Sequence, residues 1–114
     1  MVDLLPAILD FERKSLIGSI HSYVNYFRDS IENGRAEFYR PVTEETFKDA
    51  FDEIEKRKRQ FNEAIVSYSR DGTLQIIASV GDGVRMREHP DYKSMYDFIV
   101  WAESEINRIH KIWR

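Results

Sequence analysis

The chain has no cysteine among its 114 residues, and this absence removes several classes of function. It cannot form disulfides or thiolate metal sites, and it has no cysteine nucleophile. A chain of this length forms one hydrophobic core without covalent cross-links, so we expect a single domain over residues 1–114. A lack of cysteine is also typical of a reducing compartment, which predicts a cytoplasmic protein.

Long apolar runs and an excess of positive charge are missing as well. No segment approaches the roughly 20 apolar residues that span a bilayer, and Asp3 stands where a signal peptide carries a base, so we expect no membrane association. The formal net charge of -3 provides no basic field for nucleic acid, and we expect no such partner.

Motifs for catalysis and for metal binding are also absent. His21, His89 and His110 share no ligand spacing, and the chain contains no zinc motif, no serine-nucleophile motif and no phosphate-binding loop. We therefore expect no metal, no cofactor and no catalytic residue, which argues against an enzyme. The first of these histidines lies near the apolar face of its helix and is expected to be structural.

What the sequence does contain is apolar residues at helical spacing. The first such stretch predicts a helix from about Leu4 to Glu32, and Asn33-Gly34 supplies a left-handed residue to end it. The second predicts a helix that begins after the N-cap Thr43 and reaches at least Arg59. The connection between them contains aromatic residues that we expect to fold back on the core.

The segment between the second and third helices has a hairpin signal. Asp71-Gly72 separates Ile65–Tyr68 from Leu74–Ile77, and Asp-Gly between β-branched runs favours a β-hairpin. A third helix is expected from His89-Pro90-Asp91 onward, with proline in its first turn. The sequence thus predicts a mainly helical α+β fold of order ααββα. The alternative is an all-α four-helix domain, because the hairpin residues also fit helical spacing.

Several large apolar residues lie away from the main apolar faces of the first and third helices. Aromatic residues in such positions anchor interfaces, and a homodimer is the commonest way to bury them. The alternative is that other parts of the same chain cover them. The predicted interface residues are Tyr23, Tyr26, Phe98, Trp101 and Ile112.

A second candidate site follows the hairpin. Glycines let backbone amides approach a phosphate, and arginines hold oxyanions. The pattern matches no nucleotide motif, however, and such a segment is more often only a turn. The residues concerned are Gly81, Gly83, Arg85, Arg87 and His89. The basic run Lys56–Arg59 is interpreted as a solvated helix end, because its side chains point in four directions.

These patterns lead to two functional hypotheses. The first is a noncatalytic protein-interaction domain, such as an inhibitor, an immunity-type protein or an adaptor, that forms a homo-oligomer and binds another protein. The second is the binding or sequestration of a small anionic ligand such as a nucleotide.

Overall fold

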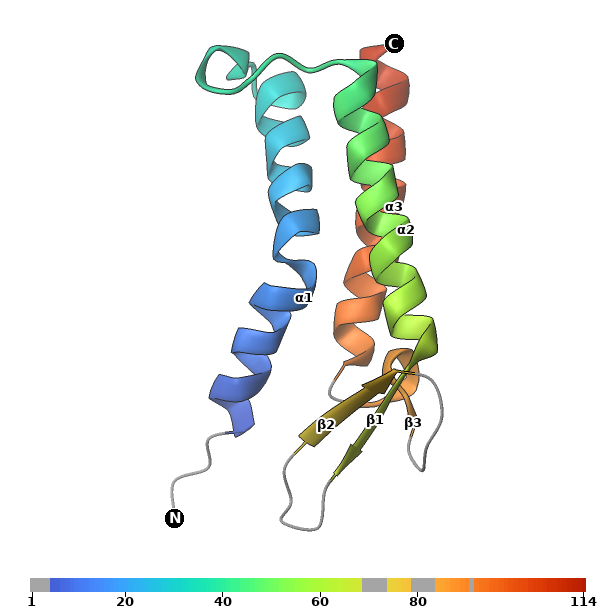
Figure 1. Ribbon diagram of the computed structural model, residues 1–114. Helices are drawn as coiled ribbons and strands as arrows, with labels where there is room; N and C mark the ends of the chain where they lie inside the picture. Colours follow the sequence, from blue (N-terminus) through green and yellow to red (C-terminus); the bar gives the residue numbers. More distant parts are fainter. Residues whose placement is uncertain (1–4, 69–73, 79–83, 91) are drawn as a thin grey trace.

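The computed structural model describes the backbone of residues 5–68, 74–78, 84–90 and 92–114, and the side chains of residues 14–66, 84–90 and 92–114. Three long helices dominate it: α1 (Leu5–Phe27), α2 (Glu44–Glu63) and α3 (Lys93–Trp113). All three pack on one another, and α1 and α3 run in the same direction while α2 runs in the opposite one (Figure 1). The predicted mainly helical architecture is therefore confirmed.

A small antiparallel sheet lies at the end of the helices where α2 finishes (Figure 1). Strand β1 (Ala64–Tyr68) continues directly from α2 and pairs with β2 (Leu74–Ala78), so that Ile65 lies opposite Ile77. The predicted hairpin is confirmed, and the four-helix alternative is wrong. A two-residue strand, β3 (Val84–Arg85), adds to the other edge of β1. The predicted turn at Asp71-Gly72 lies outside the described residues.

Residues close in sequence determine where α2 begins and where α1 ends. At the start of α2, the Thr43 side chain accepts a hydrogen bond from the Thr46 amide, and the Thr46 side chain accepts one from the Thr43 amide. This reciprocal capping box confirms the predicted N-cap. Helix α1 continues into a π-helical turn, Arg28–Glu32 (η1), and Gly34 follows with a φ of 66°. That left-handed geometry is the one expected after a helix.

The predicted start of the third helix is wrong by a few residues. The chain first makes a 3-10 turn, Met86–Glu88 (η3), and α3 begins only at Lys93. His89 lies in between, and its carbonyl accepts hydrogen bonds from the amides of Tyr92 and Lys93. Met86 and Tyr92 are fully buried, so core packing fixes this turn and overrides the helix-start signal.

The connection from α1 to α2 also departs from the expectation. It contains a 3-10 turn, Ala36–Phe38 (η2), and the Phe38 side chain is 74% exposed. Tyr39 contacts the edge of the Tyr26 ring, with centroids 5.8 Å apart, but is still exposed. The expectation that the aromatic residues of this connection fold back on the core is therefore wrong for Phe38.

One hydrophobic cluster joins all three helices with β1 and η3. Near one end of it, Phe27 of α1 and Phe47 of α2 stack almost parallel, with ring centroids 4.2 Å apart. The molecule is long and thin, with extents of 51 × 31 × 18 Å. Because a helix with its side chains is about 10–12 Å wide, at most two layers of helices fit across the thin direction. Each helix therefore keeps a side that no other helix covers.

Candidate interaction surface

Helices α1 and α3 present a shared surface along the line where they run parallel. His21 of α1 stacks on Phe98 of α3, with ring centroids 5.7 Å apart. Seven residues further along each helix, Arg28 pairs with Glu105, with Nη2 3.2 Å from Oε1. Seven residues are two helical turns, so the two contacts define a constant register between the helices.

The aromatic part of this surface centres on Trp101. Its ring lies 5.6 Å from that of Phe98, and the guanidinium of Arg28 lies 5.0 Å from its centre. Despite these neighbours Trp101 remains 41% exposed. An open cavity of about 410 Å³ lies beside Phe98 and is also lined by Ile17, His21, Ser94 and Met95.

A band of paired charges crosses the same surface. Glu105 accepts hydrogen bonds from both Arg28 and Arg108, and Arg108 also pairs with Glu32 of η1 at 2.6 Å. The hydrogen bond from Arg108, followed by that from Arg28, holds the pKa of Glu105 below its usual value. Two arginines and two glutamates leave the band without net charge.

Ile112 lies beyond this band on the same side of α3. It follows Trp101 by eleven residues, which is three turns with a residual rotation of about 20°. Its side chain is 60% exposed. We call the surface formed by these residues the α1–α3 face; it comprises His21, Arg28, Glu32, Phe98, Trp101, Glu105, Arg108 and Ile112.

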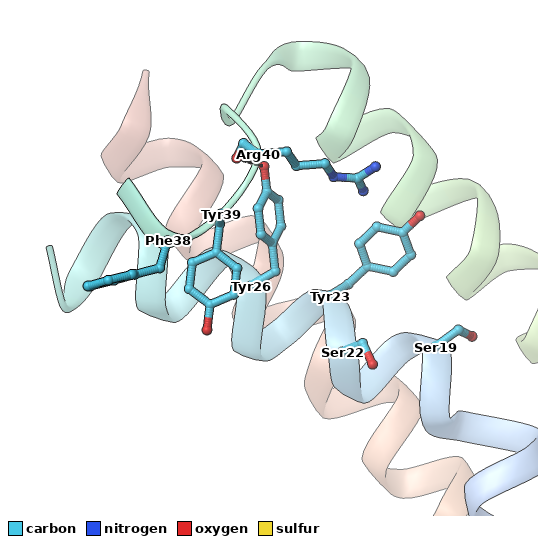
Figure 2. A pocket seen from close by; sticks show the side chains of 7 residues that line it. All are labelled: Ser19, Ser22, Tyr23, Tyr26, Phe38, Tyr39 and Arg40. Atoms are coloured by element: carbon cyan, nitrogen blue, oxygen red, sulfur yellow. Dashed lines mark hydrogen bonds between the residues drawn. The ribbon is translucent and has the colours of Figure 1, made fainter. Parts of the chain in front are cut away.

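The remaining two predicted interface residues lie elsewhere. Tyr23 and Tyr26 line a separate open pocket of about 540 Å³ between α1 and the segment that leads into α2 (Figure 2). Tyr26 is only 8% exposed, and its hydroxyl donates to the carbonyls of Arg40 and Pro41 at 2.8 and 3.0 Å. Tyr23 is half-buried beside Phe27. The structure thus divides the five predicted residues between two surfaces.

The residues of the second candidate site have contacts within the chain. Arg85 Nη1 donates to the carbonyl of Asn62 at 2.5 Å, and Arg87 Nη1 donates to the Asn62 side chain at 3.0 Å. His89 is buried, with its ring edge-on to Tyr92. These contacts hold β3 and η3 against the end of α2. Gly81 and Gly83 lie outside the described residues.

The basic run on α2 is partly solvated and partly paired. Lys58 Nζ lies 3.2 Å from Glu103 of α3, and Arg57 Nε lies 2.9 Å from Glu53. Burial is the largest single influence and acts to lower the pKa of Lys58, but the hydrogen bond to Glu103 and the negative charges of Glu103 and Glu55 together outweigh it, so the pKa is raised. Lys56 and Arg59 are exposed, as expected of a solvated helix end.

Within the described parts of the chain, no three His, Asp or Glu side chains are grouped so that they could hold a metal ion. Among the same residues, no helix is long and apolar enough to cross a membrane. Comparison of the chain with protein-family models, with curated proteins and with solved structures finds no match.

Sequence reasoning missed the charged half of the α1–α3 face. The seven-residue spacing that separates His21 from Arg28, and Phe98 from Glu105, places each pair on one side of its helix. That spacing is visible in the sequence, but it does not reveal which helix faces which. The face as a whole could therefore be recognised only once α1 and α3 were seen side by side.

Proposed function

We propose that this protein is a noncatalytic protein-interaction domain, of the inhibitor, immunity or adaptor kind, that associates with a second copy of itself through the α1–α3 face. The observation that carries the proposal is the exposure of Trp101 and Ile112 on one side of α3. Large apolar side chains on a rigid helix anchor interfaces, because their burial removes much apolar surface from water while few rotamers are lost.

The shape and charge of the face support a copy of this chain as the partner. In a two-fold dimer the same surface meets itself, so it has to be complementary to itself. The Trp101 ring is exposed and a cavity lies beside the neighbouring Phe98, so the face offers both a side chain to insert and a space to receive one. The charged band of Arg28, Glu105, Arg108 and Glu32 is neutral overall, so two copies would meet without net repulsion.

Within this proposal the protein works in the cytoplasm, as its cysteine-free composition indicates. A different protein that it binds would meet the completed dimer, or would compete for the same face. The capture of a small anion by Arg85 and Arg87 has less support, because both side chains already bind Asn62.

Sedimentation velocity over a wide concentration range tests the proposal. The wild-type chain is expected to form dimers, and the double substitution Trp101→Ser, Ile112→Ser is expected to weaken them by more than about 30-fold, since the loss of even one interface anchor costs about 2 kcal/mol or more. Val100→Ser is the matched control: Val100 is 44% exposed on α3 but points about 100° away from Trp101.

Two results would contradict the proposal. One is a wild-type chain that stays monomeric at every concentration. The other is a dimer that Val100→Ser weakens as much as the double substitution does. Thermal unfolding of each variant shows whether it remains folded, which these exposed positions should allow.

A further inference from the structure

The pocket that contains Tyr23 and Tyr26 is independent of the α1–α3 face. Helix α1 contributes residues 19, 22, 23 and 26, whose spacing of three, four and seven places them on one side of the helix. His21 and Arg28, which belong to the α1–α3 face, point to nearly the opposite side. The last residue of η2 and the two residues that follow it form the other wall. The full lining is Ser19, Ser22, Tyr23, Tyr26, Phe38, Tyr39 and Arg40.

Hydrogen bonds from two phenols fix the walls of this pocket. The Tyr26 hydroxyl, on α1, donates to two successive carbonyls of the opposite wall, those of Arg40 and Pro41. The Tyr39 hydroxyl, on that wall, donates to Asp29 Oδ2 of η1 at 2.7 Å. Each wall thus donates a hydrogen bond to the other or to the turn that continues it, so the pocket is formed without a ligand.

Arg40 is the only cation on the lining, and it has no acidic partner among the described residues. Its guanidinium lies 5.4 Å from the centre of the Tyr26 ring, and Figure 2 shows the side chain reaching across the pocket toward Tyr23. Other arginines of the molecule, such as Arg28 and Arg108, are paired with glutamates. An unpaired guanidinium at an aromatic wall is a ready partner for an oxyanion.

The serines of the pocket do not compete for this role. Ser19 Oγ donates to Glu53 at 2.8 Å, and Ser22 Oγ donates to the Gly18 carbonyl at 3.0 Å. With their protons engaged, both hydroxyls offer only acceptor lone pairs to a ligand. A negative group is therefore directed to Arg40, and the apolar rest of the ligand to Tyr23.

We propose that this pocket binds a small, flat aromatic carboxylate, with its ring against the half-buried Tyr23 and its carboxylate on the guanidinium of Arg40. The volume of about 540 Å³ lies within the roughly 300–1,000 Å³ that is usual for small-molecule sites. One guanidinium matches one carboxylate through two parallel hydrogen bonds. The site thus adds ligand binding to a protein whose proposed function is association.

Isothermal titration calorimetry with two probes of the same shape tests the site: 1-naphthoate, which carries the carboxylate, and 1-naphthamide, which is neutral. The wild-type chain is expected to bind the acid more tightly than the amide by about tenfold, as one charge-assisted contact gives. Arg40→Gln should abolish that preference and leave amide binding unchanged. Arg59→Gln, which removes an exposed charge from α2, should change neither affinity.

Ser22→Trp tests the position of the ring without altering any charge. Ser22 is exposed on α1, so the substitution should leave the fold intact, which thermal unfolding verifies, while the indole fills the pocket. Both probes are expected to lose binding to this variant. The proposal is overturned if the wild type binds neither probe, if it binds acid and amide equally, or if Ser22→Trp binds both as the wild type does.

Discussion

The guanidinium carbon of Arg28 lies over Trp101, 5.0 Å from the centre of the indole ring. The same guanidinium donates two hydrogen bonds to Glu105, which follows Trp101 by about one turn of α3. One side chain of η1 thus holds both an aromatic ring and a carboxylate of α3. Because the two elements are far apart in sequence, this contact helps to fix the rotation of one against the other.

Replacement of Arg28 by lysine should show how much of that contact depends on the planar group. Lysine keeps the charge but cannot stack on the indole while it donates two bonds to Glu105. We expect the free energy of unfolding to fall by about 0.5–1 kcal/mol, the usual size of an exposed cation–π contact. Urea unfolding measures it, and Arg59→Lys, at an exposed position of α2, is the control. Equal stability of the two variants would contradict this interpretation.

Acid should destabilise the protein through two glutamates that join helices. The hydrogen bonds from Arg114 and then His110 hold the pKa of Glu44 below its ordinary value of 4.5, and Arg108 and then Arg28 do the same for Glu105. A carboxyl group whose pKa is lower in the folded state stabilises that state above the unfolded pKa, and this contribution is lost as the pH falls through the folded value.

The free energy of unfolding should therefore change little from pH 7 to about 5, and should decrease steadily below about 4.5. Urea titrations at a series of pH values measure the slope. Glu105→Gln should reduce the slope with which the free energy of unfolding falls at acid pH. Glu37→Gln, at an exposed position, is the control and should not change that slope. A slope that is the same in all three proteins would show that the Glu105 pairs contribute nothing in solution.

The sequence predicted those parts of the fold that depend only on residues close to one another in the chain. The capping box at Thr43 needs only residues within one turn, and the hairpin needs only an Asp-Gly turn between two β-branched runs. The start of α3, in contrast, depends on packing in the core. Met86 and Tyr92 are fully buried in the hydrophobic cluster that joins the three helices, so packing, and not the proline signal at Pro90, determines where α3 begins.

The candidate site was predicted only in part, for a related reason. Periodicity showed that α1 has apolar residues on more than one side, but not which neighbour meets each side. Trp101 and Ile112 are exposed on α3, as an interface requires, whereas Tyr26 is covered by the segment that follows α1. The pairing of Arg28 with Glu105 depends on the register of two helices that the chain does not connect directly, and no local pattern encodes it.

The two described glycines should respond to alanine with opposite signs. Gly34 has a φ of 66°, so alanine there is strained by about 1 kcal/mol, although nothing lies within 4 Å of the added methyl group. Gly18 lies within α1, where the same space is free and alanine is the better helix former by about 0.8–1 kcal/mol. Thermal unfolding should show a lower midpoint for Gly34→Ala and a higher one for Gly18→Ala. If both midpoints shifted in the same direction, either Gly34 would not be left-handed or Gly18 would not be helical in solution.

The stacked pair Phe27 and Phe47 should be coupled energetically, because it joins the last residue of α1 to the beginning of α2. The rings are 4.2 Å apart and only 4° from parallel, and both side chains are fully buried. Replacement of either by leucine should cost about 1 kcal/mol, and the double replacement should cost less than the sum by about 0.5–1.5 kcal/mol, the usual worth of an aromatic pair.

A double-mutant cycle in urea measures this coupling, with Phe27→Leu combined with Phe61→Leu as the control cycle. Phe61 is also fully buried on α2, but fourteen residues, or about 21 Å of helix, separate it from Phe47. Effects at that distance are expected to add within about 0.5 kcal/mol. If the Phe27–Phe47 cycle were equally additive, the two rings would not be in contact in solution, and α1 would have to pack on α2 in another register.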